Sequence, residues 1–195
     1  MAEAVEAPGR TALLIIDMIN ALDFEDAAPL LKAAEAAVGP ILKRRDAADA
    51  AGVPVIYIND NDDEWHSERS RLIEKVTESD APGREITRRI KPRDNDYFII
   101  KPQFSGFYST NLPVLLPRLG VSRLVLTGVA ADICVLFTAA DAHMREYDLW
   151  VPEDSVASSD RQRTQWALEI MRNSMDADTD PAGERSLEEW IAKGG

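Results

Sequence analysis

Short apolar runs recur along the chain, and each is followed by polar or turn-forming residues. The run at residues 13–16 shows no polar alternation, which is typical of a strand buried on both faces. The runs at 55–58, 97–100, 124–127 and 149–151 have the same character. We therefore predict five strands, the first followed by Asp17 and the third by Lys101.

Apolar residues at helical spacing separate these runs. A stripe from about Ala27 to Gly52 predicts a helix that Gly39 and Pro40 kink or divide in two. Ser159 is predicted to cap a later helix. Three more helices are predicted at 111–119, 134–145 and 187–192.

Three segments lie outside this pattern. Residues 59–63 predict a loop, because short polar side chains compete with regular backbone pairing. Residues 64–91 are charged and weakly periodic, so they predict no element. The acidic turn at 176–180 has room for one short edge strand.

Strands that alternate with helices pair in parallel, because each crossover helix returns the chain across the sheet. The order of elements predicts a single doubly wound, Rossmann-like α/β domain, with a mostly parallel sheet and helices on both faces. We expect the domain to cover residues 11–195, after a frayed N-terminus at 1–10. No internal repeat or low-complexity linker divides it.

Composition narrows the functional classes. Apolar residues make up 45% of the 195 residues, enough for a buried core. A formal charge of −12 repels phosphate backbones and argues against a nucleic-acid partner. The N-terminal residues lack the apolar core of a signal peptide, and charges interrupt the long apolar stretches that a membrane partner would need. Since the one cysteine cannot form an internal disulfide, we expect a cytoplasmic protein.

Three residues with useful chemistry follow predicted strands, at the edge where open parallel sheets bind ligands. They are Asp17, Lys101 and Cys134, the last beginning the helix after the fourth strand. Each alone also fits a capping acid, an exposed lysine or an inert buried thiol. Together they favour a nucleophile, because a helix N-terminus and a lysine stabilise thiolate and a carboxylate can accept the thiol proton.

The sequence around these residues carries several motifs. Residues 128–135 read Gly-Val-Ala-Ala-Asp-Ile-Cys-Val and residues 14–20 read Leu-Ile-Ile-Asp-Met-Ile-Asn. Between them, 100–102 read Ile-Lys-Pro and 104–107 read Phe-Ser-Gly-Phe. In this order the motifs resemble those of the isochorismatase-like cysteine hydrolases, and the resemblance runs from about residue 11 to residue 158.

The resemblance implies a triad of Asp17, Lys101 and Cys134 that attacks a carbonyl or carboximidic carbon and releases ammonia or an amine. It also implies a cis peptide bond between Val129 and Ala130. The backbone N–H groups of Ala130 and Cys134 would then point at the developing oxyanion.

Two branches of that family fit less well. Nicotinamidases hold a metal with an Asp-x-His pair after the second strand and a further His, whereas this region reads Asp60-Asn61-Asp62 and the only histidines are His66 and His143. We predict no metal and no cofactor. Isochorismatases proper cleave a vinyl ether without a cysteine nucleophile, so Cys134 favours hydrolysis of a carbon–nitrogen bond in a small amide, carbamoyl or ureido compound.

Two alternatives to this acyl-enzyme mechanism stay open. One is vinyl ether hydrolysis of the isochorismatase type, and the other is a catalytically idle family member that binds a small molecule or a protein. A dinucleotide-binding module is disfavoured, because no Gly-x-Gly-x-x-Gly follows the first strand.

Aromatic residues on the surrounding loops are candidates for the pocket wall, although core or subunit packing explains them as well. They are Phe24, Trp65, Phe104, Phe107 and Tyr108. Four arginines either meet a substrate carboxylate or balance surface acids: Arg69, Arg71, Arg88 and Arg89.

By resemblance, the chain is expected to form a homo-oligomer, either a dimer or a tetramer. Apolar residues that suit a subunit contact, or equally the core, are Val135, Leu136, Phe137 and Trp150.

Overall fold

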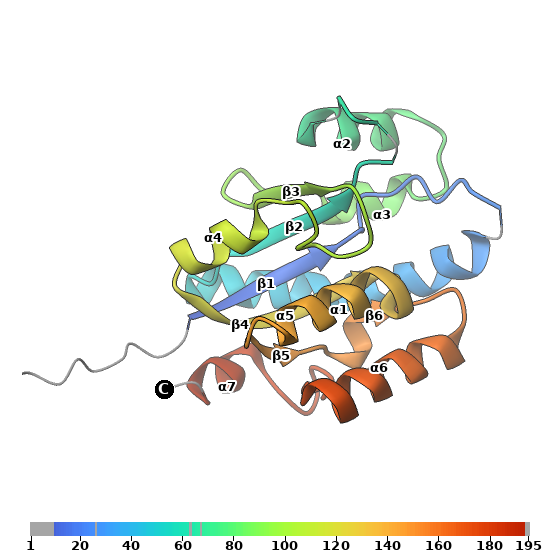
Figure 1. Cartoon of the computed structure of the whole chain (residues 1–195). Coiled ribbons are helices and arrows are strands. Elements are labelled where there is room, and N and C mark those ends of the chain that lie inside the picture. Colours follow the sequence, from blue (N-terminus) through green and yellow to red (C-terminus); the bar gives the residue numbers. More distant parts are fainter. Residues whose placement is uncertain (1–9, 26, 63, 67, 194–195) are drawn as a thin grey trace, which may run out of the picture.

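A parallel β-sheet forms the centre of the computed structural model, which describes residues 10–25, 27–62, 64–66 and 68–193 (Figure 1). The strands in the described residues are β1 (Arg10–Ile16), β2 (Val55–Asp60), β3 (Tyr97–Lys101), β4 (Val121–Val129), β5 (Asp148–Trp150) and β6 (Val156–Ala157). Their order is β3-β2-β1-β4-β5, and β6 pairs with β4. Each of these strand pairs is parallel.

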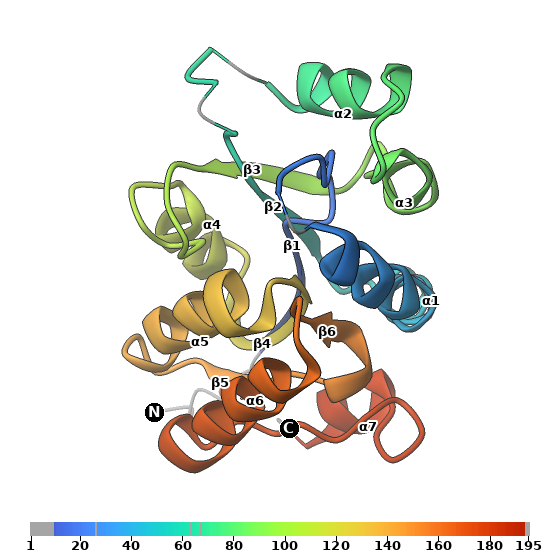
Figure 2. The same cartoon turned by 90° about the vertical axis from the view of Figure 1, so that its right-hand side faces the viewer.

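Helices cover both faces of this sheet (Figure 2). They are α1 (Ala27–Ala51), α2 (Arg69–Glu78), α3 (Arg84–Ile90), α4 (Leu112–Arg118), α5 (Leu136–His143), α6 (Arg161–Met175) and α7 (Leu187–Ala192), with a π-helical turn η1 (Ala131–Val135) and a 3-10 turn η2 (Glu153–Ser155). Residues of α4, α5 and α6 pack in the core on one face, and residues of α1, α3 and α7 pack in the core on the other. The predicted doubly wound fold is confirmed. Within the described residues, no helix is long and apolar enough to cross a membrane.

Strand β1 lies in the middle of the sheet and is buried on both sides. Successive side chains of a strand point to opposite faces, so Leu14 and Ile16 enter one core while Leu13 and Ile15 enter the other. Both neighbours, β2 and β4, pair with β1 in parallel. Asp17 therefore leaves the sheet at the centre of its carboxyl edge.

Helix α1 is not divided, so that part of the prediction is wrong. It continues from Ala27 to Ala51 with Pro40 inside it. A proline within a helix removes one backbone hydrogen bond, but this helix buries a long stripe that includes Val38 and Ile41 against the sheet. That packing keeps the two halves in one continuous helix.

The predicted loop at 59–63 is also wrong in part, because Asn59 and Asp60 extend β2. They pair with Ile100 and Lys101 of β3. The side chain of Asn59 bonds both backbone groups of Ile19, at 3.1 Å and 2.8 Å, so it does not compete with the sheet. Asp63 lies outside the described residues.

The unassigned segment at 64–91 contains α2 and α3. Helix α2 buries only Leu72 and Val76, which explains why its apolar period is weak. It packs beside α3, toward the carboxyl edge of the sheet (Figure 1).

Three smaller predictions at the chain ends and caps need correction. Asp160, not Ser159, caps α6, since its side chain accepts hydrogen bonds from the N–H groups of Gln162 and Arg163. The acidic turn at 176–180 forms one isolated bridge to Trp150 in place of the expected edge strand. The short strand that the sequence did not predict is β6. Arg10 begins β1, and residues 1–9 of the predicted frayed N-terminus lie outside the described residues.

Candidate active site

Four neighbouring strands contribute to one cavity at the carboxyl edge of the sheet. Asp17 follows β1, Asp60 ends β2, Lys101 ends β3, and Cys134 lies in η1 after β4. The cavity has a volume of about 240 Å³, and Asp17, Asp60 and Cys134 are among its lining residues. Drug-sized ligand pockets have volumes of roughly 300–1,000 Å³, so this cavity suits a small substrate.

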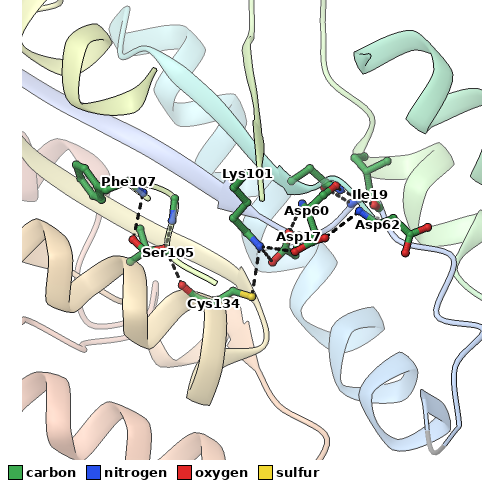
Figure 3. Close-up of polar contacts among 11 residues, drawn as sticks. Asp17, Ile19, Asp60, Asp62, Lys101, Ser105, Phe107 and Cys134 are labelled. Atoms are coloured by element: carbon green, nitrogen blue, oxygen red, sulfur yellow. Dashed lines mark hydrogen bonds and ion pairs between the residues drawn. The ribbon is translucent and has the colours of Figure 1, made fainter. Parts of the chain in front are cut away.

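Lys101 joins the polar residues of the site (Figure 3). Its ammonium nitrogen lies 2.9 Å from Asp17 Oδ2 and 3.1 Å from Asp60 Oδ2. It also donates to Cys134 Sγ at 3.5 Å. The side chain of Lys101 is fully buried, and these three acceptors match its three N–H donors.

Asp17 is held in place from two directions. Its backbone N–H donates to the carbonyl of Ile58 at 2.8 Å, and its Oδ1 accepts the backbone N–H of Asp60 at 2.7 Å. The backbone of Asp17 is left-handed, with φ at 52°, a conformation that aspartate and asparagine tolerate better than most residues. The carboxylate also lies near enough to Cys134 for the two groups to shift each other's pKa.

Burial and charge set the protonation of these groups. Burial and, after it, the charge of the Asp17 carboxylate raise the pKa of the Cys134 thiol to about 12, although Lys101 opposes both. Burial also raises the pKa of Asp17, against the attraction of Lys101. For Lys101, burial acts to lower the pKa, but Asp17, Cys134 and Asp60 together hold it above its ordinary value. Burial and the charge of Asp17 therefore favour the thiol over the thiolate at Cys134, beside the salt bridge between Lys101 and Asp17.

The backbone around Cys134 has an uncommon course. Cys134 does not begin α5, as predicted, but lies in η1, where the carbonyl of Ala130 accepts the N–H groups of Ile133 and Val135 at 3.1 Å each. Neither of these two bonds uses the N–H of Cys134. The peptide bond between Val129 and Ala130 is cis.

The loop after β3 is fixed to α5 and presents one aromatic ring to the cavity. Gly106 N–H donates to Thr138 Oγ1 at 2.9 Å, and Ser105 Oγ donates to Asp141 of α5. Phe104 consequently lines the cavity. Phe107, on the other side of these anchors, is only 3% exposed and packs in the core against Tyr147, so its predicted place in the pocket wall is wrong.

The other predicted pocket aromatics separate into two groups. Phe24 lines the cavity, as Phe104 does. Trp65 and Tyr108 instead line a neighbouring groove with Phe104 and Phe137, which we call the aromatic groove. Phe104 is common to both spaces and separates them.

The remaining candidates for the pocket and the subunit contact lie elsewhere. None of Arg69, Arg71, Arg88 and Arg89 lines the cavity. Arg69 donates to backbone carbonyls of Pro92 and Arg93, and Arg88 pairs with Glu85. Val135 and Trp150 are fully buried in the core, the second of the two alternatives given for them, while Leu136 is half-buried and Phe137 is half-exposed.

Three residues of the site were missed as functional candidates. Asp60 ends a strand, so the same edge rule that selects Asp17 and Lys101 also selects it. Asn59 fixes the loop after β1 through its two bonds to Ile19. Lys75 of α2 lines the cavity, but its segment shows no pattern in the sequence that would assign it to the site.

The carboxylates after β2 are both bonded to lysines. Asp60 meets Lys101, and Asp62 Oδ2 lies 2.6 Å from Lys75 Nζ. Both histidines, His66 and His143, are exposed and do not line the cavity. Across the described part of the chain, no cluster of three or more His, Cys, Asp or Glu side chains is placed to hold a metal ion.

Comparisons with known proteins agree on one family. The family model "Isochorismatase domain" matches residues 11–180. The isochorismatase family protein YaaI of Bacillus subtilis is 41% identical over 167 residues, which cover 86% of this chain and 91% of that protein. Ureidoacrylate amidohydrolase RutB of Serratia proteamaculans is 31% identical over 72% of this chain and 67% of its own. The crystal structure of N-carbamoylsarcosine amidase from Thermoplasma acidophilum superposes with a TM-score of 0.70 at 32% identity, covering 91% of this chain and 99% of that one.

Proposed function

The chain belongs to the isochorismatase family of hydrolases, and from this premise we propose that it hydrolyses a carbon–nitrogen bond in a small amide, carbamoyl or ureido compound. Cys134 acts as the nucleophile, with Asp17 and Lys101 completing the catalytic triad. The observation that supports this most directly is the contact of the buried Lys101 ammonium with both the Asp17 carboxylate and the Cys134 sulfur, at 2.9 Å and 3.5 Å.

In the first half of the reaction, the sulfur of Cys134 attacks the carbonyl carbon while Asp17 takes the thiol proton. This transfer accompanies the attack, because burial and the charge of Asp17 favour the neutral thiol over the thiolate beforehand. The backbone N–H groups of Ala130 and Cys134 stabilise the oxyanion, and Lys101 stabilises the negative charge on the sulfur. Asp17 then gives its proton to the leaving nitrogen, and ammonia or an amine departs.

In the second half, Asp17 takes a proton from water, and the resulting hydroxide attacks the thioester. The collapse of this intermediate breaks the carbon–sulfur bond, and the sulfur recovers the proton from Asp17. The cycle consumes one water and needs no cofactor. One carboxylate serves as base and acid in turn, which requires that it stays close to both the sulfur and the leaving group.

Relatives support the reaction class. RutB is named for hydrolysis of ureidoacrylate, and the matched Thermoplasma enzyme is named for N-carbamoylsarcosine. The compounds in both names contain a carbamoyl nitrogen. The small volume of the cavity is consistent with substrates of that size.

The test is ammonia release over a panel of small amides, ureas and carbamoyl amino acids, measured with the wild-type chain and with Cys134→Ala. We expect turnover of at least one compound, and a loss of roughly 10³-fold or more in Cys134→Ala. Unchanged turnover in that variant would eliminate the acyl-enzyme mechanism. Isochorismate cleavage without ammonia release would support the vinyl ether alternative, and ligand binding without any turnover would support an idle binding protein.

Two broader expectations stay predictions. Size-exclusion chromatography with light scattering measures whether the chain forms a dimer or a tetramer. A cytoplasmic location, expected from the single cysteine, is measured by cell fractionation.

A further inference from the structure

Lys75 is the cation that a substrate carboxylate would be expected to meet in the catalytic cavity. It is the one lysine among the lining residues, which include no arginine or histidine in the part of the chain that the structure describes. None of the residues outside the described ranges is a lysine, arginine or histidine. The residues of this chain outside the described ranges therefore add no cationic side chain to the cavity.

Lys75 is already bonded to two carboxylates. Its Nζ lies 2.6 Å from Asp62 Oδ2 and 2.9 Å from Glu64 Oε1, and these contacts raise its pKa. An ammonium between two carboxylates belongs to a group with a net negative charge. Lys75 therefore holds the loop after β2 against α2, and it offers no excess positive charge to a ligand.

The catalytic lysine has the same arrangement. Lys101 is paired with Asp17 and Asp60, as described above. Two lysines and four carboxylates thus lie in or directly beside the cavity, and their formal charges sum to −2 when the thiol of Cys134 is neutral. A substrate carboxylate held between them would be repelled, and this repulsion is screened less at the buried pair of Lys101 and Asp17 than at the exposed group around Lys75.

We infer that this cavity selects neutral or cationic amide and ureido substrates over anionic ones, and that Asp62 and Glu64 set this preference by neutralising Lys75. The inference rests on the proposed function and narrows its substrate class. It also separates this chain from relatives that are named for carboxylate substrates, ureidoacrylate and N-carbamoylsarcosine.

Alkylation tests the charge of the cavity without requiring turnover. Because Cys134 is the only cysteine in the chain, every modified thiol reports from the cavity. Iodoacetamide is neutral and iodoacetate is its anionic counterpart. We expect the ratio of their second-order rate constants at Cys134 to exceed the ratio for the neutral thiol N-acetylcysteine amide by roughly 30-fold or more, as one like charge about 8 Å away at an effective dielectric of about 20 requires.

Charge variants assign the effect to named residues. Asp62→Asn and Glu64→Gln each free Lys75 from one carboxylate, so we expect each to lower the iodoacetamide preference by roughly threefold or more. Asp62 has a φ of 51°, which asparagine tolerates. Asp94→Asn is the matched control, since Asp94 is exposed before β3 at the opposite edge of the sheet and changes the net charge equally. A wild-type ratio within threefold of the free thiol, or an equal fall in Asp94→Asn, overturns the inference.

A matched set of ureas tests the same preference in catalysis. Propylurea is neutral, 2-aminoethylurea is cationic and N-carbamoylglycine is anionic, and the three are close in length. We expect N-carbamoylglycine to have the lowest kcat/KM of the three, and turnover of N-carbamoylglycine above that of propylurea also overturns the inference. Absence of turnover with every compound counts against the proposed function, and the alkylation ratio then decides the inference alone.

Discussion

Replacing Asp17 with asparagine should change the reactivity and the catalysis of Cys134 in opposite directions. The Asp17 carboxylate raises the pKa of the thiol by its negative charge, and it is also the proposed base. Asparagine keeps the left-handed backbone at this position and can still accept the N–H of Asp60. The variant therefore removes charge and basicity with little change of shape.

The size of the effect follows from the charge of Asp17, which lies near enough to the thiol to raise its pKa. Two unit charges about 4 Å apart at an effective dielectric of 20 interact by about 4 kcal/mol, or roughly 3 pKa units. Without this repulsion the pKa of Cys134 should fall from about 12 toward roughly 9. At pH 8 the thiolate fraction then rises by roughly 1,000-fold, and the weaker nucleophilicity of a less basic thiolate offsets about 20-fold of this gain. Alkylation by iodoacetamide should be roughly 50-fold faster.

The assay is the pH dependence of iodoacetamide modification between pH 6 and pH 11, followed by mass spectrometry, together with ammonia release on an accepted substrate. Asp17→Asn should modify faster at pH 8 and lose roughly 10²-fold or more in turnover. Asp23→Asn, an exposed residue on the same loop, is the control for net charge. Slower or unchanged modification in Asp17→Asn, with an intact fold by circular dichroism, would refute the proposed coupling between carboxylate and thiol.

Three more predictions follow from the same site and its support. Because burial raises the pKa of Asp17 and the base must be ionised, the acidic limb of kcat/KM should lie above pH 3.8 and activity should fall as pH decreases through it; a limb at or below that pH contradicts the role of Asp17. Phe104→Ala should join the catalytic cavity to the aromatic groove and raise the kcat/KM of N-benzylurea relative to methylurea by roughly tenfold, and an unchanged ratio would place the wall elsewhere. Gly128→Ala should lower the free energy of unfolding by at least about 2 kcal/mol in urea titrations, because its Cβ would lie 2.0 Å from the carbonyl oxygen of Ile16 at a φ of +110°; a loss below about 0.5 kcal/mol would contradict this packing.

The sequence predicts the centre of this molecule well, because buried parallel strands are read from continuous apolar runs. The residue after such a run must lie at the carboxyl edge, and this rule brings Asp17 and Lys101 together without any structural knowledge. Asp60 obeys the same rule. Its polar neighbours predict a loop there, and only the pairing with β3 shows that the strand continues through it.

Tertiary contacts decide the features that the sequence does not predict. Phe104 and Phe107 are three residues apart on one loop, yet one lines the cavity and the other enters the core. The hydrogen bonds from Ser105 and Gly106 to α5 determine this division, and neither partner is near in sequence. Lys75 likewise enters the site from a helix whose apolar pattern is too weak to predict.

The order of the strands explains why a lysine joins this site. Neighbouring strands lie about 4.8 Å apart, so β3 is separated from β1 by roughly 10 Å with β2 between them. Only a long side chain from the edge strand β3 reaches Asp17 on β1 and the sulfur beyond it. That path crosses the end of β2, where Asp60 meets the same ammonium at 3.1 Å. Lys101 therefore contacts a second carboxylate because its side chain passes the end of β2, and Asp60 leaves one of the two net negative charges that we expect to disfavour anionic substrates.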